Sequence, residues 1–359
     1  MQNKLHHKFH TKLISYDQFM EYKLYDLNEG YYSEKNQELW GIDYMTSPII
    51  HPAFGLLIAK YVYAVWISMN SPNTFSLIEI GGGNLNFINN IFDGIKKLSS
   101  KFADLLNIVV IDRNFKNDLQ FYKNIKLINS DSFNLKNITG VIISNELFDA
   151  LPFKRFIYKK NKFYEIFTNY CNDFEEQEFE IKYNPFNKYP KEIYSIPGKV
   201  FAYSPSQKKM IEDIAAGMRS GVVLTIDYGY LFNDLKKNKN LMTDARIINK
   251  QNIMNNIYSE DLVDISSFVN FDLLIDWFKE FGFDFMFSDK QSKFLQDLRI
   301  VNFTKSYLEN AVNMSEALKY IRTLEDLIND DIFGDYIVLG VSKGLNNFNH
   351  NLVLGKLKD

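Results

Sequence analysis

Short, continuous runs of apolar residues alternate along this chain with segments of helical periodicity. Four runs cover residues 75–80, 106–111, 141–144 and 222–226. The strands of a parallel sheet are buried on both faces and are joined by helices, so this pattern predicts an α/β fold with a parallel sheet. A fifth run, Tyr336–Ser342, predicts one more strand, which we place at the edge of the sheet.

Helical periodicity predicts the elements around these strands. Helices are expected over residues 15–30 and 53–69, after the glycines of residues 81–83, and over 271–281. Between the apolar runs, residues 153–200 alternate aromatic and charged side chains, a pattern typical of hairpins.

The expected organisation is one α/β core with a helical N-terminal cap and two insertions. The predicted divisions are residues 1–70 for the cap, 71–152, 201–230 and 283–359 for the core, 153–200 for a hairpin-rich insertion, and 231–282 for a second insertion with a helix.

Composition excludes several classes of function. The 359 residues are 46% hydrophobic and 24% charged, which is typical of a globular chain with a sizeable core. The net charge of -3 provides no overall basic field, so nucleic acid is not an expected partner. Cys171 is the only cysteine, which excludes an intrachain disulfide and a cysteine-based zinc site; we expect no metal site.

No stretch of the sequence predicts insertion into a membrane. The first sixteen residues are polar and lack the apolar region of a signal peptide. The apolar stretch of residues 56–69 is interrupted by Lys60 and is too short to cross a bilayer. We therefore expect a cytoplasmic protein.

The strongest local signal follows the first apolar run. Glu79 and Ile80 end that run, and Gly81, Gly82 and Gly83 come next. Ligands of parallel sheets bind at the carboxyl ends of the strands, and glycines there let backbone N–H groups approach a ligand closely. Asp112 ends the second run, where a carboxylate accepts hydrogen bonds from a ribose diol. The pattern indicates an adenosine-bearing ligand, with a plain turn as the alternative.

The residues around the glycines narrow the choice of ligand. A dinucleotide fingerprint needs a small residue where Asn86 stands, and no Lys-Ser or Lys-Thr pair follows to make a phosphate-binding loop. Glu79 would repel a pyrophosphate but suits a cationic amino-acid group. S-adenosylmethionine carries both an amino group and a sulfonium, so it fits best.

A third strand end carries acidic residues. Asn145, Glu146 and Asp149 follow the run of residues 141–144, which places two acids and an amide near the reactive end of the ligand. The alternative interpretation is a helix N-cap with solvated acids.

The same segment resembles a known family. Residues 144–152 read SNELFDALP, and they occur in order with FMEYKLYD at 19–26, GYY at 30–32, DYMTSP at 43–48 and DYGY at 227–230. With the glycine loop, these motifs resemble the MidA-type family, whose mitochondrial member is an arginine methyltransferase that assists respiratory complex I assembly.

The resemblance implies a fold and a donor site. The fold would be that of a Rossmann-like class I methyltransferase, with a seven-stranded, mostly parallel sheet whose last strand is antiparallel. S-adenosylmethionine would be the methyl donor and S-adenosylhomocysteine the product. The residues expected to form a lip over the donor or to hold it are Thr46, Ser47, Pro48, Glu79, Gly81, Gly82, Gly83 and Asp112.

Methylation of an arginine sets the expected catalytic roles. The guanidinium stays charged because its pKa is above ~12, so carboxylates must orient it and accept its proton. We assign Glu146 to guanidinium binding, with Asp149 and Asn145 in support. Asp227 and Asp264 are weaker candidates because acids at these positions equally stabilise turns.

Several positions depart from the family pattern. Gly82 replaces the usual proline between the two glycines, and Ala202 replaces a glutamate ahead of a Ser-Pro pair. Phe268 and Asn270 replace a histidine and an aspartate. Donor binding is therefore expected to be retained, whereas the acceptor could differ from that of relatives.

The expected function is methylation of an arginine in a partner protein. Two alternatives stay open: a donor-binding assembly factor or chaperone with little catalysis, and a small-molecule methyltransferase. A homodimer also stays open.

Overall fold

The computed structural model describes residue 9 and residues 11–33, 36, 45–115, 119–171, 174–249, 252–254, 256, 258, 262–310 and 313–357. The chain divides into two compact units. Unit 1 consists of Met1–Tyr44, Phe148–Lys209 and Gly229–Leu274, and unit 2 of Met45–Leu147, Met210–Tyr228 and Ile275–Asp359. Neither unit is one continuous stretch of chain.

Unit 2 is built around a seven-stranded sheet in the order β16-β17-β10-β5-β2-β3-β4. The strands are β2 (Phe75–Ile80), β3 (Leu106–Asp112), β4 (Ile125–Asn129), β5 (Ile138–Asn145), β10 (Met218–Asp227), β16 (Asp284–Lys290) and β17 (Ile337–Lys343). The five strands from β10 to β4 pair in parallel, whereas β17 is antiparallel to both β10 and β16. The predicted α/β class is confirmed, including the mostly parallel sheet and its antiparallel last strand.

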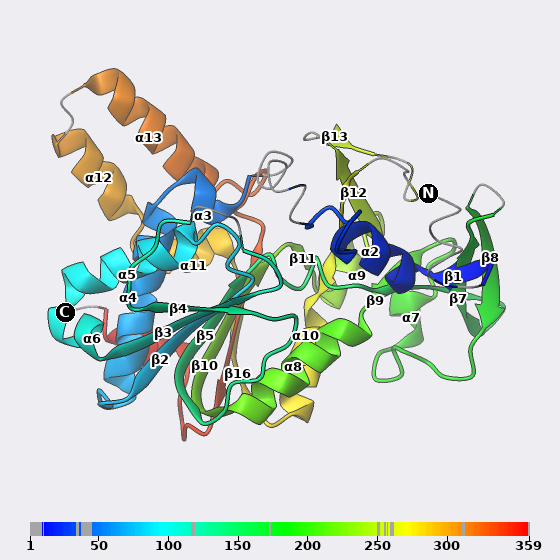
Figure 1. The fold of residues 1–359 in the computed structure, drawn as a ribbon, viewed down its shortest axis with the longest axis horizontal. Helices are drawn as coiled ribbons and strands as arrows, with labels where there is room; N and C mark the ends of the chain where they lie inside the picture. The colour runs from blue at the N-terminus through cyan, green and yellow to red at the C-terminus, as the bar shows by residue number, and fades with distance from the viewer. Residues whose placement is uncertain are drawn as a thin grey trace. The chain divides into compact units, whose positions relative to one another are not determined.

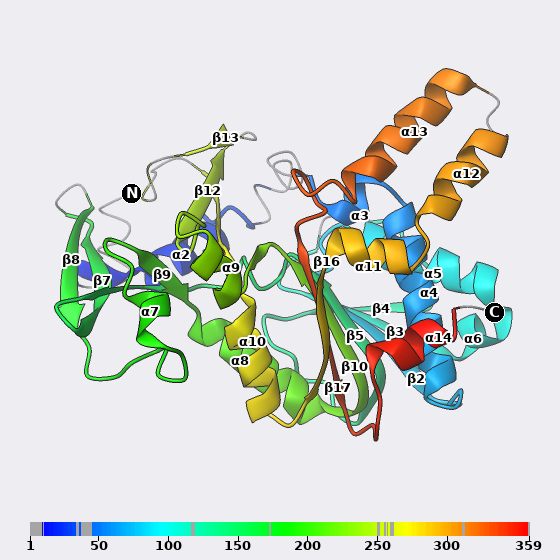
Figure 2. The ribbon, with the colours of Figure 1, turned by 180° about the vertical axis from the view of Figure 1, so that it is seen from behind.

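The helices of unit 2 include those that cover this sheet, as the ribbon shows (Figure 1). They are α3 (Ser47–Ile50), α4 (Ala53–Ser68), α5 (Asn86–Leu98), α6 (Ser100–Leu105), α11 (Gln291–Asp297), α12 (Val301–Asn310), α13 (Met314–Asp326) and α14 (His350–Gly355). Alternate strand residues such as Leu77 and Val110 share a buried core with Phe54 of α4, Ile91 of α5 and Phe294 of α11. In both views α12 and α13 project away from the sheet (Figure 2).

Unit 1 contains an antiparallel sheet in which β1, β7, β6 and β9 follow one another and β8 pairs with β7. The strands are β1 (Leu13–Ser15), β6 (Lys154–Lys159), β7 (Lys162–Asn169), β8 (Glu175–Glu180) and β9 (Val200–Tyr203). Two smaller sheets join β11 (Gly229–Tyr230) to β15 (Val269–Asn270), and β12 (Ala245–Asn249) to β13 (Asn252–Ile253) and β14 (Asp264–Ser267).

Short helices complete unit 1. They are α2 (Tyr16–Tyr25), α7 (Lys191–Tyr194) and α9 (Phe232–Lys237). Tyr16, Phe19 and Phe153 are fully or almost fully buried in its core. Two further helices, α8 (Pro205–Gly217) and α10 (Phe271–Glu280), begin in unit 1 and end in unit 2.

The predicted core elements are confirmed. The first four apolar runs form β2, β3, β5 and β10, and the helix predicted over residues 53–69 is α4, Ala53–Ser68. The hairpin prediction for 153–200 is also correct, because β6 pairs with β7 and β7 with β8. The helix predicted over residues 15–30 ends earlier, at Tyr25.

The predicted position of the last strand is wrong. Tyr336–Ser342 was placed at the edge, but β17 has β10 on one side and β16 on the other. Its continuous burial fits a strand with two neighbours, as the apolar run requires. β16 escaped recognition because it is the true edge strand, and exposed residues such as Asp284 and Phe285 interrupt its apolar pattern.

Candidate functional site

The glycine loop leaves β2 at the carboxyl end of the sheet of unit 2. Gly81 and Gly83 have φ angles of +80° and +47°, a left-handed region that glycine adopts without strain. The N–H of Gly81 donates to the carbonyl of Ile111 on β3 at 2.8 Å, and the N–H of Leu85 donates to the carbonyl of Gly82 at 2.8 Å. The loop therefore turns tightly before α5 begins at Asn86.

Three strand ends lie beside one another here. Ile80 of β2 is in register with Ile111 of β3 and with Ser144 of β5. Gly81, Asp112 and Asn145 are the next residues along their respective strands. The structure thus brings together residues that the sequence placed at separate strand ends.

Asp112 fixes the loop to the end of β3. Its Oδ2 atom accepts a hydrogen bond from the N–H of Gly83 at 2.9 Å, and its Oδ1 atom accepts one from the N–H of Asn114 at 3.1 Å. Burial raises the pKa of the Asp112 carboxyl, and these backbone hydrogen bonds act in the opposite direction.

Glu79 is a buried acid beside the loop. Its side chain is 3% exposed, and Oε2 has no hydrogen-bond partner among the described residues. Burial and, next, the nearby charge of Asp112 raise the pKa of Glu79 well above its ordinary value, while a hydrogen bond from the backbone of Ile88 lowers it. A buried carboxylate oxygen without a partner is costly, so a cationic ligand group is the chemical complement of this position.

These features fit S-adenosylmethionine. The donor carries positive charge, which complements the buried carboxylate of Glu79. Its ribose hydroxyl groups donate hydrogen bonds of the kind that a carboxylate such as that of Asp112 accepts. Gly83 leaves open space, because a Cβ built there would meet no atom within 4 Å. The assignment of individual contacts to Glu79, Gly81, Gly83 and Asp112 stays a prediction.

Gly82 packs tightly against β3. A Cβ at this position would lie 2.1 Å from Cγ1 of Val110. Val110 is itself fully buried in the core of unit 2. Glycine therefore stands where the family pattern has proline because the side chain of Val110 takes up the space of a Cβ atom.

The predicted lip begins at Thr46, which precedes the first turn of α3. Ser47 and Pro48 are buried. The hydroxyl of Ser47 donates to Oε1 of Gln291 at 3.1 Å, and Nε2 of Gln291 donates to the carbonyl of Leu327 at 2.9 Å. Sequence reasoning missed Gln291, and no local pattern marks it. The DYMTSP motif is only partly visible, since residues 43 and 44 lie outside the described residues.

Asn145 and Glu146 stand at the end of β5. Nδ2 of Asn145 donates to Oε1 of Glu146 at 3.1 Å. Glu146 has a φ angle of +50°, which is strained for a residue with a side chain, and its N–H donates to the carbonyl of Ile226 at 2.9 Å. The backbone thus turns sharply at Glu146, the residue predicted to bind the guanidinium.

Asp149 belongs to unit 1, unlike Asn145 and Glu146. It is 6% exposed, and its carbonyl accepts a hydrogen bond from the N–H of Ser267 at 3.0 Å. The neighbouring carbonyls of Phe148 and Ala150 accept hydrogen bonds from Gln207 Nε2 at 2.7 Å and from the Tyr25 hydroxyl at 2.8 Å. These contacts give the segment after Glu146 a well-defined structural role in unit 1.

Other candidates have local partners. Oδ1 of Asp227 accepts a hydrogen bond from the N–H of Tyr228 at 2.9 Å. Oδ1 of Asp264 accepts one from the hydroxyl of Tyr32 at 3.0 Å. Nδ1 of His51 accepts one from the N–H of Ala53 at 2.9 Å, and burial lowers the pKa of His51 to about 4. His51 therefore stabilises the start of α4.

No helix in the described part of the chain combines the length and the apolar character needed to cross a bilayer.

Comparisons with known proteins support S-adenosylmethionine as the donor. Residues 57–287 match the model of a family described as "putative S-adenosyl-L-methionine-dependent methyltransferase". The chain is 20% identical over 254 residues to the mitochondrial protein arginine methyltransferase NDUFAF7 homolog of Drosophila melanogaster, and 24% identical over 176 residues to that of Caenorhabditis elegans. These matches cover 61% and 40% of this chain, and 58% and 40% of the relatives, so the chain spans about half of their length.

A solved structure shows the same fold. The crystal structure of a Burkholderia thailandensis protein bound to S-adenosyl-homocysteine has a TM-score of 0.78 with this chain at 16% sequence identity. The similarity covers 98% of this chain and 93% of that one.

Proposed function

The chain belongs to this family of S-adenosyl-L-methionine-dependent methyltransferases, and we propose that it methylates an arginine side chain of a partner protein. The observation that carries the proposal is the placement of Glu146. Glu146 follows Asn145 at the end of β5, and β5 pairs with β2, the strand that leads into the glycine loop.

The donor half of the proposal rests on unit 2 alone. Glu79 offers a buried, unpartnered carboxylate oxygen, and Asp112 holds the loop through Gly83. When bound, S-adenosylmethionine would supply a methyl group activated by its positive sulfur. The described residues contribute position: alignment of reacting atoms is worth about 7–11 kcal/mol in favourable cases.

The acceptor half rests on charge. A guanidinium binds carboxylates through a planar fork of N–H donors, and it remains protonated because its pKa is above ~12. The Glu146 carboxylate would orient the acceptor and take up its proton as the new N–C bond forms. The hydrogen bond from Asn145 holds Oε1 of Glu146 in place. The names of the two distant relatives point to the same acceptor class.

A second function, donor-dependent assembly without catalysis, is favoured by the changed residues near the end of unit 1. Oδ1 of Asn270 accepts a hydrogen bond from the N–H of Leu273 at 3.2 Å, and Nδ2 donates to the hydroxyl of Tyr230 at 3.3 Å. Asn270 thus serves the start of α10. Because Asn270 has this structural role, one side chain fewer is available to bind the acceptor.

A labelling experiment separates these functions. Purified protein and methyl-labelled S-adenosylmethionine would be added to lysate of cells that lack the protein, and labelled sites identified by mass spectrometry. We expect a labelled arginine with the native protein and with Glu325→Gln, an exposed control in unit 2, but not with Glu146→Gln.

The alternatives give different results. A complementation assay in the same cells reports assembly: if Glu146→Gln restores growth without labelling, the assembly function stands and the catalytic proposal fails. Label in a small molecule rather than in protein would indicate the remaining alternative, a small-molecule methyltransferase.

A further inference from the structure

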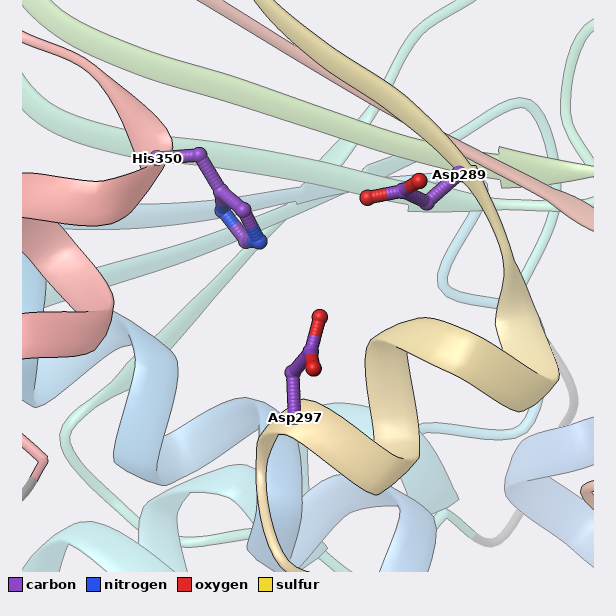
Figure 3. Close-up of side chains that lie close together, drawn as sticks. All are labelled: Asp289, Asp297 and His350. Atoms are coloured by element: carbon purple, nitrogen blue, oxygen red, sulfur yellow. The ribbon is translucent and has the colours of Figure 1, made fainter.

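A group of side chains of metal-ligating types includes one on β16, the edge strand of the unit 2 sheet, which β17 and β10 separate from β5 and β2. It consists of Asp289 on β16, Asp297 at the end of α11 and His350 at the start of α14. One possible ligand atom from each of the three lies within 4.8 Å of the others. Figure 3 shows the two carboxylates and the imidazole pointing toward a common space. All three residues belong to unit 2.

His350 is the feature that distinguishes this group from an ordinary acidic surface. The residue is only 7% exposed, and its ring stacks on that of Phe287 with centroids 3.8 Å apart. Nδ1 shares a hydrogen bond with the Tyr61 hydroxyl at 3.3 Å, whereas Nε2 is buried without a partner among the described residues. When Nδ1–H donates to Tyr61, the lone pair of Nε2 is left for a ligand.

A cation already occupies part of the group. Nζ of Lys293 lies 3.0 Å from Oδ2 of Asp289 and 2.8 Å from Oδ2 of Asp297. The hydrogen bond with Asp297 is the largest cause that raises the pKa of Lys293. The ammonium satisfies the carboxylates but donates no hydrogen bond to Nε2 of His350, so the basic imidazole nitrogen stays unused.

We propose that Asp289, Asp297 and His350 bind a divalent transition-metal ion of the Zn²⁺ type, and that the ammonium of Lys293 swings away when the ion enters. One imidazole nitrogen with two carboxylate oxygens suits Zn²⁺ and its neighbours, whereas Mg²⁺ and Ca²⁺ prefer oxygen ligands alone. Three protein ligands leave a fourth tetrahedral position for water.

The geometry requires a modest closure. Tetrahedral ligands at about 2.0–2.1 Å from Zn²⁺ lie roughly 3.3 Å from one another. The present separation of up to 4.8 Å closes by rotation of Asp297, which is on the surface at the end of a helix. The ion would then tie α14 to β16 and α11, which follow one another directly in the sequence and are far from α14. It would stabilise the folded state by binding it selectively.

The chain offers a matched control for the role of lysine. Lys290 bridges Asp330 at 2.9 Å and Asp335 at 2.5 Å, much as Lys293 bridges its own pair. Among the described residues, only the Lys293 pair has a histidine beside it. Removing either lysine leaves two carboxylates without their ammonium partner. A difference in zinc affinity between the two variants would therefore depend on the histidine.

The test is calorimetric titration of the metal-free protein, residues 1–359, with ZnCl₂. His6, His7 and His10 would be replaced by glutamine in every sample, because histidines near the N-terminus bind zinc on their own. We expect one bound ion and a raised melting temperature. Lys293→Met should tighten binding about tenfold or more by removing the competing ammonium, and Lys290→Met should leave it unchanged.

Ligand variants decide whether the binding belongs to this group. Asp297→Asn, at an exposed position, should weaken binding at least about tenfold without loss of the fold, as circular dichroism would show. Absence of binding by both the native protein and Lys293→Met would overturn the proposal. Equal gains from Lys293→Met and Lys290→Met, or unchanged binding by Asp297→Asn, would also overturn it.

Discussion

The carboxylate of Asp112 accepts a hydrogen bond from the backbone N–H of Gly83 at 2.9 Å. This contact joins the end of β3 to the turn that leaves β2, and therefore sets the shape of the loop before any ligand arrives. A charged acceptor makes such a hydrogen bond stronger than one between neutral groups. Asp112 thus has a structural role in addition to the ribose contact that its position predicts.

Loss of the Asp112 carboxylate should weaken donor binding. A hydrogen bond to a charged group contributes about 1.5–3 kcal/mol, so Asp112→Ala should raise the dissociation constant for S-adenosylmethionine roughly tenfold to a hundredfold. Calorimetric titration measures this change. The exposed Asp131→Ala variant in the same unit should bind normally. A change of less than about twofold in Asp112→Ala would contradict the predicted role.

Alanine at Gly82 should destabilise the protein through a clash on β3. Its Cβ would lie 2.1 Å from Cγ1 of Val110, and overpacking of a core costs about 1–3 kcal/mol. The free energy of unfolding in urea measures the effect. Combination with Val110→Ala should cost less than the sum of the two single changes, because the smaller neighbour leaves room for the new methyl group. Strict additivity would show that the contact is absent.

The charge of Glu79 should make the stability of the donor-free protein fall as the pH rises. The pKa of this acid is raised above its ordinary value of 4.5, so the folded state binds its proton more tightly than the unfolded state. Stability is then lost as the pH rises above 4.5 and through the folded-state pKa. Glu79→Gln should remove this dependence and be the more stable protein at neutral pH.

Urea unfolding of the native protein and of Glu79→Gln at several pH values measures this difference. Parallel stability curves for the two proteins would contradict the prediction. Donor binding should also release a proton, because a nearby positive charge favours ionised Glu79. Calorimetry in buffers of different ionisation enthalpy detects that release.

Sequence patterns predicted the parts of the fold and site that depend on neighbouring residues. The apolar runs ending near Ile80, Asp112 and Asn145 became buried strands because each run is long enough to cross a covered sheet. The parallel arrangement then brought their ends together, and with them Glu79 and the glycines. These predictions needed only strand burial and the rule that ligands bind at the carboxyl ends.

The remaining contacts depend on pairs that are distant in sequence and leave no local signal. Ser47 and Gln291 are 244 residues apart, and neither position lies in a recognisable pattern with the other. Leu13 of β1 pairs with Asn169 of β7, although β1 is only three residues long. Asp289 and His350 come together because strand β16 and helix α14 meet in the folded unit. Only tertiary packing specifies such pairs.

Replacement of Gln291 by leucine should affect donor binding through Ser47. The variant removes the acceptor of the Ser47 hydroxyl and leaves the buried carbonyl of Leu327 without its donor, which costs about 1–3 kcal/mol of stability. If Ser47 lines the donor site, the KM for S-adenosylmethionine should rise severalfold while kcat changes little. Ser292→Ala, next in the chain, should change neither constant. A loss of kcat alone would argue against a positioning role.

Arg155 in unit 1 should be far more important to stability than the ion pairs on the surface of the same sheet. It is 4% exposed, and its Nε and Nη2 atoms each lie 2.7 Å from a carboxylate oxygen of Asp244. Its Nη1 atom donates to Glu176 and to the hydroxyl of Tyr258. Arg155→Met would leave Asp244 without its partner. Breaking a buried pair costs about 3–5 kcal/mol, and because the Asp244 side chain is 23% exposed we expect a loss at the lower end of that range.

The corresponding change in the Lys159–Glu178 pair should cost less than about 1 kcal/mol, because both side chains reach solvent. Urea unfolding followed by circular dichroism compares Arg155→Met with Lys159→Met. Arg155→Lys provides the intermediate case: it keeps the charge but cannot form the two parallel hydrogen bonds to Asp244, so its stability should fall between that of the native protein and that of Arg155→Met. Equal stability of Arg155→Lys and the native protein would mean that charge alone, and not the planar fork, holds this part of unit 1 together.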